Sequence, residues 1–190
     1  MSEPALLLSL ATFALIGLLP RIFFRDGRLV PMWWATAFPF FVCPVVLLLG
    51  YAGVLAPLAP SAWHRWLDPA SALLSAASIG LICMTIGTHR VPLALWHQDD
   101  DAPQHLVTYG AYARIRHPFY AAFLLAFLGA FAAFPHWTTL CAAAYGAVVL
   151  NATAAREERR LAASAFGEEY RRYLSRTGRF LPRLRVPAPR

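Results

Sequence analysis

Long runs of apolar residues alternate with short polar segments along this chain of 190 residues. A helix needs about 20 apolar residues to cross a hydrocarbon layer of about 30 Å. Runs of roughly that length predict five membrane helices, at 4–19 with an extension toward 22–24, then 33–55, 69–88, 119–134 and 137–155. Pro135 and His136 separate the last two runs, which therefore form a helical hairpin with almost no loop.

The fourth run is short for a membrane helix. At about 1.5 Å per residue it reaches only about 24 Å. This leaves open a hairpin that crosses the membrane fully and one that is tilted or only partly inserted.

The composition supports a membrane protein. Hydrophobic residues make up 58% of the chain and charged residues only 14%, with a mean hydropathy of +0.49. Soluble domains of this size carry about 25% charged residues. We therefore expect one all-α, multi-pass membrane domain over 1–190, with three N-terminal membrane helices in 1–88 and a more polar region in 89–190.

The arginines predict the orientation. All 17 basic residues are Arg, and those near membrane ends gather on one side, at 21, 25, 28, 90, 114, 116 and from 156 onward. Only Arg65 falls on the other side. By the positive-inside rule the arginine side is cytoplasmic, so we expect a cell (inner) membrane protein with its N-terminus outside and a cytoplasmic C-terminal helix. This asymmetry also explains the net charge of +7, and no nucleic-acid partner is expected.

The isolated cysteines and histidines predict packing and interfacial roles. Cys43, Cys83 and Cys141 lie inside apolar runs without metal-ligand spacing, so we expect buried small hydrophobic residues and no metal site. His64 and His136 fall at the outer ends of predicted helices and are expected at the membrane interface.

Two polar segments, 97–120 and 156–173, hold most of the remaining chemistry. In the first, Arg116-His117-Pro118-x-Tyr120 precedes an apolar run. Pro118 suits the first turn of a helix, which places His117 at its entrance and Tyr120 one turn in, facing the same way. A helix N-terminus attracts anionic groups. The alternative is an ordinary membrane-entry cap, with Arg116 reaching toward lipid head groups.

In the second segment, Glu157 and Glu158 stand where the fifth run leaves the membrane. A carboxylate at that depth is costly unless it pairs or binds a ligand. Each carboxylate can accept hydrogen bonds from a ribose diol or pair with Arg. The alternative is a solvated helix with pairs such as Glu157 with Arg160.

Together the two segments resemble the isoprenylcysteine carboxyl methyltransferase and phospholipid methyltransferase family of integral membrane enzymes. The similarity covers about half of the chain, 87–182, and rests on four motifs in order. They are His105-Leu106-Val107-Thr108-x-Gly110-x-Tyr112, Arg116-His117-Pro118-x-Tyr120, Glu157-Glu158-x-x-Leu161 and Phe166-Gly167-x-Glu169-Tyr170-x-x-Tyr173.

That family binds S-adenosylmethionine in a cavity near the cytoplasmic face. The resemblance therefore implies that 89–190 is a cofactor-binding methyltransferase region, acting on a lipophilic acceptor such as a carboxylate, a thiol or a lipid head group. It implies contacts to the cofactor from His97, Gln104, His105, Leu106, Val107, Tyr112, His117, Pro118, Phe119, Tyr120 and Glu157. Arg156 and Glu158 are the expected substrate contacts. No general base is assigned, because a carboxylate or thiolate acceptor needs none.

Two departures from the family pattern bear on the substrate. Ala122 stands where the family often has Gly, which narrows the space by one methyl group. Thr153 stands where the prenylcysteine enzymes have an Arg, and Arg156 lies three positions away on the same helix. A prenylated cysteine is therefore not assumed. Two alternative functions remain open: an NADPH-dependent reductase related to the C-terminal half of sterol reductases, and a non-catalytic membrane protein on the same scaffold.

Overall fold

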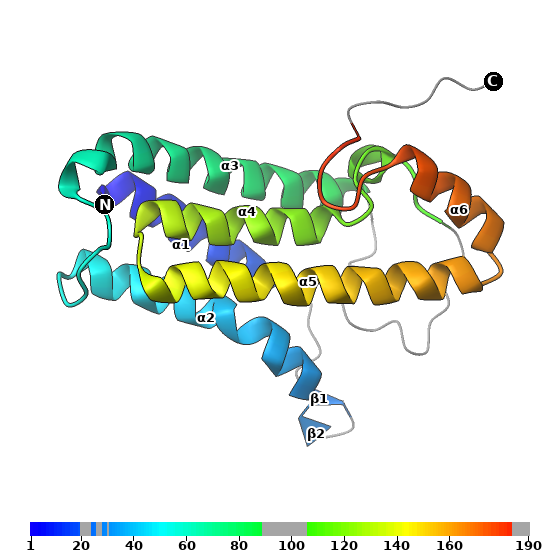
Figure 1. The fold of residues 1–190 in the computed structure, drawn as a ribbon, viewed down its shortest axis with the longest axis horizontal. Helices are drawn as coiled ribbons and strands as arrows, with labels where there is room; N and C mark the ends of the chain where they lie inside the picture. The colour runs from blue at the N-terminus through cyan, green and yellow to red at the C-terminus, as the bar shows by residue number, and fades with distance from the viewer. Residues whose placement is uncertain (20–23, 26–27, 30, 89–105, 184–190) are drawn as a thin grey trace.

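A computed structural model describes residues 1–19, 24–25, 28–29, 31–88 and 106–183, and within these it is helical apart from one short ribbon (Figure 1). The ribbon pairs β1 (Phe24–Arg25) with β2 (Arg28–Leu29) in antiparallel register. The α-helices are α1 (Glu3–Leu18), α2 (Pro31–Tyr51), α3 (His64–Thr88), α4 (Pro118–Ala133), α5 (Trp137–Ala163) and α6 (Gly167–Arg176). Two short 3-10 helices are η1 (Ser61–Trp63) and η2 (Gly110–Ala113).

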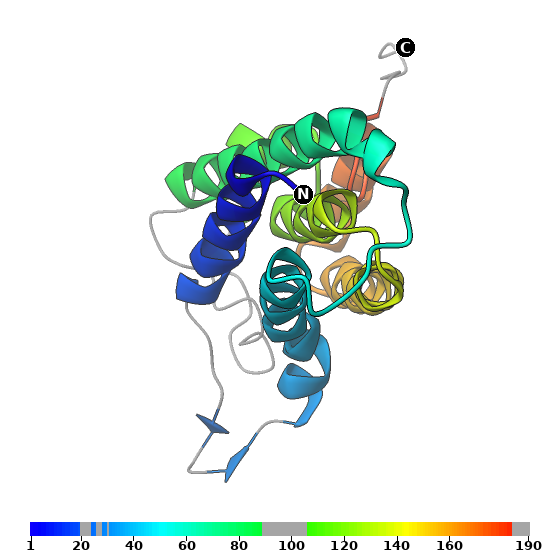
Figure 2. The ribbon, with the colours of Figure 1, turned by 90° about the vertical axis from the view of Figure 1, so that its left-hand side faces the viewer.

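The first five α-helices form a bundle whose members run roughly along one long axis (Figures 1 and 2). One end of the bundle holds the start of α3 and the turn between α4 and α5. A hydrogen bond of 2.7 Å from the Leu58 N–H to the Pro135 carbonyl joins the α2–α3 loop to that turn. The opposite end holds η2, the C-terminal end of α5 and α6.

Helix α4 lies at the centre of the bundle and contacts α1, α2, α3 and α5. Its small side chains allow this, because Ala122, Ala126 and Ala130 are almost fully buried and let neighbouring helices approach closely. Larger rings fill the remaining space, and the Phe40 and Phe127 centroids are 4.6 Å apart. Helix α4 can therefore serve as the fixed element on which a site is built.

Hydroxyl groups also join the helices inside this core. Ser9 Oγ on α1 lies 3.3 Å from Ser71 Oγ and 3.4 Å from Ser75 Oγ on α3. Ser78 Oγ donates to the Ala122 carbonyl over 2.7 Å. Hydrogen bonds of this kind between apolar helices stabilise a bundle that is surrounded by lipid.

Among the residues that the structure describes, three helical stretches are long and apolar enough to cross a membrane: Trp34–Tyr51, Ser61–Thr88 and Trp137–Ala163. Helices α1 and α4 are apolar but have only 16 residues each. The prediction of an all-α protein with apolar, membrane-compatible helices is thus confirmed. Five full crossings stay a prediction.

Boundaries of three helices differ from those predicted. Helix α2 ends at Tyr51, before the predicted end at 55. Helix α3 begins at His64 and carries Pro69 inside it, whereas 69 was the predicted start. Helix α5 continues to Ala163, past the predicted end at 155, and so carries Glu157 and Glu158 within regular helix.

The prediction of three buried cysteines is wrong for two of them. Cys43 is buried in the bundle, while Cys83 and Cys141 are exposed on its outside, and all three are free thiols. Apolar runs that face lipid and apolar runs that face protein have similar composition, which is why sequence could not separate them. Of the two outer histidines, His136 caps α5 by accepting from the Thr138 N–H over 3.2 Å.

Candidate active site

The site begins at the first turn of α4. His117 is the N-cap residue and Pro118 opens the helix, which confirms the boundary predicted from the motif. A segment after α6 lies beside this turn: the Arg116 N–H donates to the Gly178 carbonyl over 2.9 Å, and the His117 N–H donates to the Arg179 carbonyl over 3.1 Å. A parallel bridge between Ile115 and Gly178 completes the pairing. The backbone of the helix entrance is therefore held by residues more than 60 positions away in sequence.

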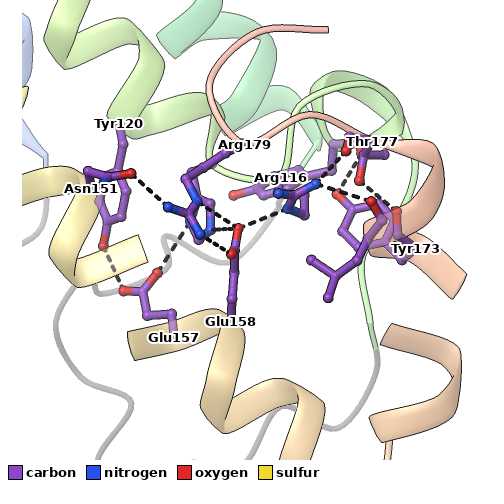
Figure 3. A network of polar contacts seen from close by, with 11 residues as sticks. Arg116, Tyr120, Asn151, Glu157, Glu158, Tyr173, Thr177 and Arg179 are labelled. Carbon is purple, nitrogen blue, oxygen red and sulfur yellow. Dashed lines mark hydrogen bonds and ion pairs between the residues drawn. The ribbon is translucent and has the colours of Figure 1, made fainter. Parts of the chain in front are cut away.

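Tyr120 on α4 and Glu157 on α5 point toward each other (Figure 3), and His117 lies close to both. The Tyr120 hydroxyl donates to Glu157 Oε1 over 2.6 Å. His117 Nδ1 lies 3.4 Å from Glu157 Oε2, and the His117 and Tyr120 rings are parallel with centroids 5.4 Å apart. The Glu157 side chain is 25% exposed, whereas that of His117 is only 9% exposed. A carboxylate is thus fixed in position yet still open to a ligand.

Glu158, the next residue, is enclosed by arginines. Arg116 Nε donates to Glu158 Oε1 over 2.9 Å, and Arg179 Nε donates to the same oxygen over 3.1 Å. Arg179 Nη2 binds Oε2 as well. His117 Nε2 is 3.3 Å from Glu158 Oε1 but lacks the direction of a hydrogen bond. The hydrogen bonds to Glu158 raise the pKa of Arg179, so this guanidinium stays charged.

The same arginines tie the network to other elements (Figure 3). Arg116 Nη1 donates to the Thr177 carbonyl, and Arg179 Nη1 donates to Asn151 Oδ1 on α5 over 2.7 Å. Farther along α6, the Tyr173 hydroxyl donates to the Tyr112 carbonyl over 2.6 Å. Charge-assisted hydrogen bonds of this kind position side chains more firmly than neutral ones. Here they fix α4, α5 and the segment after α6 against one another.

The predicted site residues have different outcomes. His117, Tyr120 and Glu157 come together, and Glu158 has Arg116 and Arg179 as partners. The roles assigned to these residues toward a cofactor and a substrate stay predictions. Pro118 and Phe119 are buried in the first turn of α4, and Arg156 is exposed on α5 next to the acidic pair. Leu106, Val107 and Tyr112 are half-buried in the segment that leads to α4. His97, Gln104 and His105 lie outside the described residues.

Three contributors to this site were not predicted from the sequence: Asn151, Thr177 and Arg179. Asn151 is an amide side chain within the apolar part of α5, which is a signal for a specific partner. Arg179 carries no comparable signal, because it is one of several arginines near the C-terminus.

No family model, curated protein or solved structure matches the chain. Within the part of the chain that the structure describes, no three His, Cys, Asp or Glu side chains converge as metal ligands would. The geometry of Glu157 and its neighbours is therefore the basis on which a function can be proposed.

Proposed function

We propose that this chain is an integral membrane methyltransferase that uses S-adenosylmethionine and methylates a lipophilic or membrane-partitioned acceptor. The observation that carries the proposal is the convergence of His117, Tyr120 and Glu157 at the entrance of α4. Described residues of all four sequence motifs lie in or beside this place, although an apolar hairpin separates the second motif from the third.

The residues fit a cationic cofactor that carries a ribose diol. The partly exposed Glu157 carboxylate has lone pairs left for diol hydroxyls or for an ammonium group, because each oxygen can accept more than one hydrogen bond. The first turn of α4 has no side-chain cap, and its positive dipole end suits the cofactor carboxylate. Both polar ends of the cofactor would thus find complementary charge.

A dinucleotide phosphate cofactor fits less well. A 2′-phosphate needs a cation, and the two arginines of this site already hold Glu158. A phosphate group placed beside Glu157 would be repelled by the negative charge of its carboxylate. This contrast favours S-adenosylmethionine over NADPH.

When bound, S-adenosylmethionine supplies a methyl group that is already strongly electrophilic. The residues of the chain would then contribute alignment and exclusion of water. Glu157, fixed by Tyr120, would orient the ribose or the amino group. The Arg116–Glu158–Arg179 network would hold His117 and the helix entrance in place. We assign no proton transfer to any residue.

We further propose that the five apolar helices all enter the membrane, with the arginine-rich end in the cytoplasm and the N-terminus outside. The large exposed aromatic residues Trp63, Trp66 and Trp137 support this, because they belong to η1 and to the first turns of α3 and α5. These helices begin at the end of the bundle opposite to the site (Figure 1). Tryptophans of this kind mark membrane interfaces. The cofactor would enter from the cytoplasm and the acceptor from the inner leaflet.

The proposal is tested by binding and by transfer. Protein purified in a mild detergent is titrated calorimetrically with S-adenosylmethionine and, separately, with NADPH. Membranes that contain the protein are incubated with methyl-labelled cofactor, and extracted lipids and small thiols are analysed by mass spectrometry. Binding of S-adenosylmethionine with label transfer supports the proposal. Binding of NADPH alone, or of neither cofactor, overturns it.

A further inference from the structure

A cavity lies next to the polar network, between η2 and α6. Its volume is about 400 Å³, and its walls are Thr108, Ala113, Glu169, Arg172, Tyr173, Arg176 and Thr177. Cavities that bind small ligands fall in the range of about 300–1,000 Å³. Glu157, His117 and Tyr120 do not line it, so it is separate from the proposed cofactor site.

Two guanidinium groups at this cavity are uncommitted. Arg172 and Arg176 are four residues apart on α6, which places both on one helix face. Both are exposed, and among the described residues their side chains make no hydrogen bond or ion pair. Three other arginines at this end are engaged. Arg116 and Arg179 hold Glu158, and Arg183 donates to the Ser175 carbonyl over 2.5 Å.

Two other residues that line the cavity, Tyr173 and Thr177, are held in place by hydrogen bonds. The Tyr173 hydroxyl is bound to the Tyr112 carbonyl, and the buried Thr177 side chain donates to the Tyr173 carbonyl over 2.7 Å. A ligand would therefore meet a preformed surface with two exposed cations at its rim. Preorganisation of this kind lowers the entropic cost of binding.

We propose that this cavity binds the head group of an anionic phospholipid of the cytoplasmic leaflet, with a phosphodiester on Arg172 and Arg176. Arginine matches phosphate oxygens through paired N–H donors. Glu169 adds one acceptor, which suits a head group with hydroxyl donors, as in phosphatidylglycerol. The elements that line the cavity, η2 and α6, lie at the arginine-rich end of the bundle, beyond α4 and beside the end of α5 (Figure 1). Such head groups would lie at this end.

The inference goes beyond methyl transfer. It rests on the proposed orientation, in which the bundle is embedded in a bilayer with its arginine-rich end at the cytoplasmic leaflet. One connection to the cofactor site exists, because the Thr177 carbonyl accepts from Arg116 while the Thr177 side chain lines the cavity. Lipid binding is nevertheless measurable without any turnover.

The test is native mass spectrometry of the full chain released from detergent micelles that contain equal amounts of dioleoyl phosphatidylglycerol and dioleoyl phosphatidylcholine. We expect the native protein to retain phosphatidylglycerol preferentially. The double variant Arg172→Gln/Arg176→Gln should bind it roughly 30-fold more weakly, from about 1 kcal/mol for each arginine near the membrane surface. Addition of inorganic phosphate should not displace the lipid.

The matched control is Arg114→Gln/Arg159→Gln, which removes the same charge from exposed positions at the same end but outside the cavity. It should keep the affinity for phosphatidylglycerol within about twofold, because screened charges at a distance contribute little. Equal losses in both variants would mean that general charge holds the lipid and would overturn the inference. Displacement by inorganic phosphate would also overturn it, since the cavity would then be a site for free phosphate.

Calorimetric titration of the same variants with S-adenosylmethionine separates this inference from the proposed function. Arg172→Gln/Arg176→Gln should bind the cofactor like the native protein, because neither arginine contacts Glu157 or His117. A chain that binds lipid but no cofactor supports the lipid site alone.

Discussion

The Tyr120 hydroxyl donates a 2.6 Å hydrogen bond to the Glu157 carboxylate across 37 positions of sequence. This contact joins the first turn of α4 to the polar end of α5, and it keeps one oxygen of a partly exposed carboxylate in place. The remaining acceptor capacity of Glu157 then points to a ligand.

Glu157→Gln tests that interpretation most directly. The amide oxygen can still accept from Tyr120, but the negative charge is lost. A hydrogen bond to a charged group contributes about 1.5–3 kcal/mol, so the affinity for S-adenosylmethionine should fall roughly 10- to 100-fold. Calorimetry on the purified protein measures the change. Glu168→Gln, at an exposed position on α6, serves as the control and should bind normally. Unchanged affinity in Glu157→Gln would remove Glu157 from the cofactor site.

We expect Glu158 to contribute to the stability of the fold. Its side chain and that of Arg116 are each only 10% exposed, and removal of one partner leaves a buried charge. Glu158→Ala should therefore lower the free energy of unfolding by about 3–5 kcal/mol. The apolar pair Arg116→Met/Glu158→Leu should lose less than the sum of the single changes, with a coupling of about 1–3 kcal/mol. Unfolding in detergent monitored by circular dichroism gives these values. Strict additivity would show that the ion pair does not act as a unit.

Substitution of two glycines by alanine distinguishes the effect of steric strain on stability from that of helix propensity. Gly110 has φ +60°, and a Cβ there would collide with Thr88 Oγ1 at the end of α3. Gly110→Ala should cost about 2–4 kcal/mol from the left-handed conformation and the overlap. Gly80 is inside α3, and no atom lies within 4 Å of the place that an alanine methyl group would take, so Gly80→Ala should stabilise by about 0.5–1 kcal/mol. Thermal unfolding of both variants tests the contrast, and a neutral Gly110→Ala would contradict it.

Orientation is tested with single cysteines. The natural Cys43, Cys83 and Cys141 are first replaced by alanine. On that background, Ser61→Cys introduces a thiol at the aromatic end and Ser175→Cys one at the arginine end, both at exposed positions. A membrane-impermeant maleimide applied to intact cells should label Ser61→Cys and leave Ser175→Cys unlabelled until the cells are lysed. The reverse pattern would invert the proposed topology.

Alkaline pH should weaken the contact between α6 and η2. Burial raises the pKa of Tyr173 to about 12. An unfolded tyrosine ionises near pH 10, so the unfolded state loses its proton first and stability falls between about pH 10 and 12, by roughly 2 kcal/mol for this group. Tyr173→Phe should show a shallower loss over that window in denaturant titrations at fixed pH. Tyr109→Phe, at an exposed position, should retain the native slope, and an equal flattening in both variants would contradict the assignment.

The helices were predictable because a membrane helix is marked by its length and apolarity. The entrance of α4 was also predictable, since Pro118 restricts the backbone there and has no N–H to satisfy. The ends of the helices were harder to predict. The predicted start at Pro69 falls in the second turn of α3, because the first turn is polar and a search for runs of apolar residues does not include it. Charged residues at the end of α5 likewise concealed that the helix continues past them.

The site was predictable only in part, for a physical reason. Glu157 and His117 meet because α4 and α5 are neighbours in an antiparallel hairpin, which follows from their short connection. Arg179 reaches Glu158 through a turn after α6 and a backbone bridge to Ile115, and no periodicity encodes that path. Sequence spacing therefore located the two carboxylates without showing which one is held by arginines.

The bridge beside the α4 entrance makes the charged end of the hairpin depend on residues that follow α6. The Arg179 side chain and the Gly178 carbonyl lie beyond Arg176, the last residue of α6. A chain cut before residue 178 would therefore contain every helix of the bundle and still lack one of the two arginine partners of Glu158. The backbone N–H groups of Arg116 and His117 would lose their carbonyl partners in the same truncation.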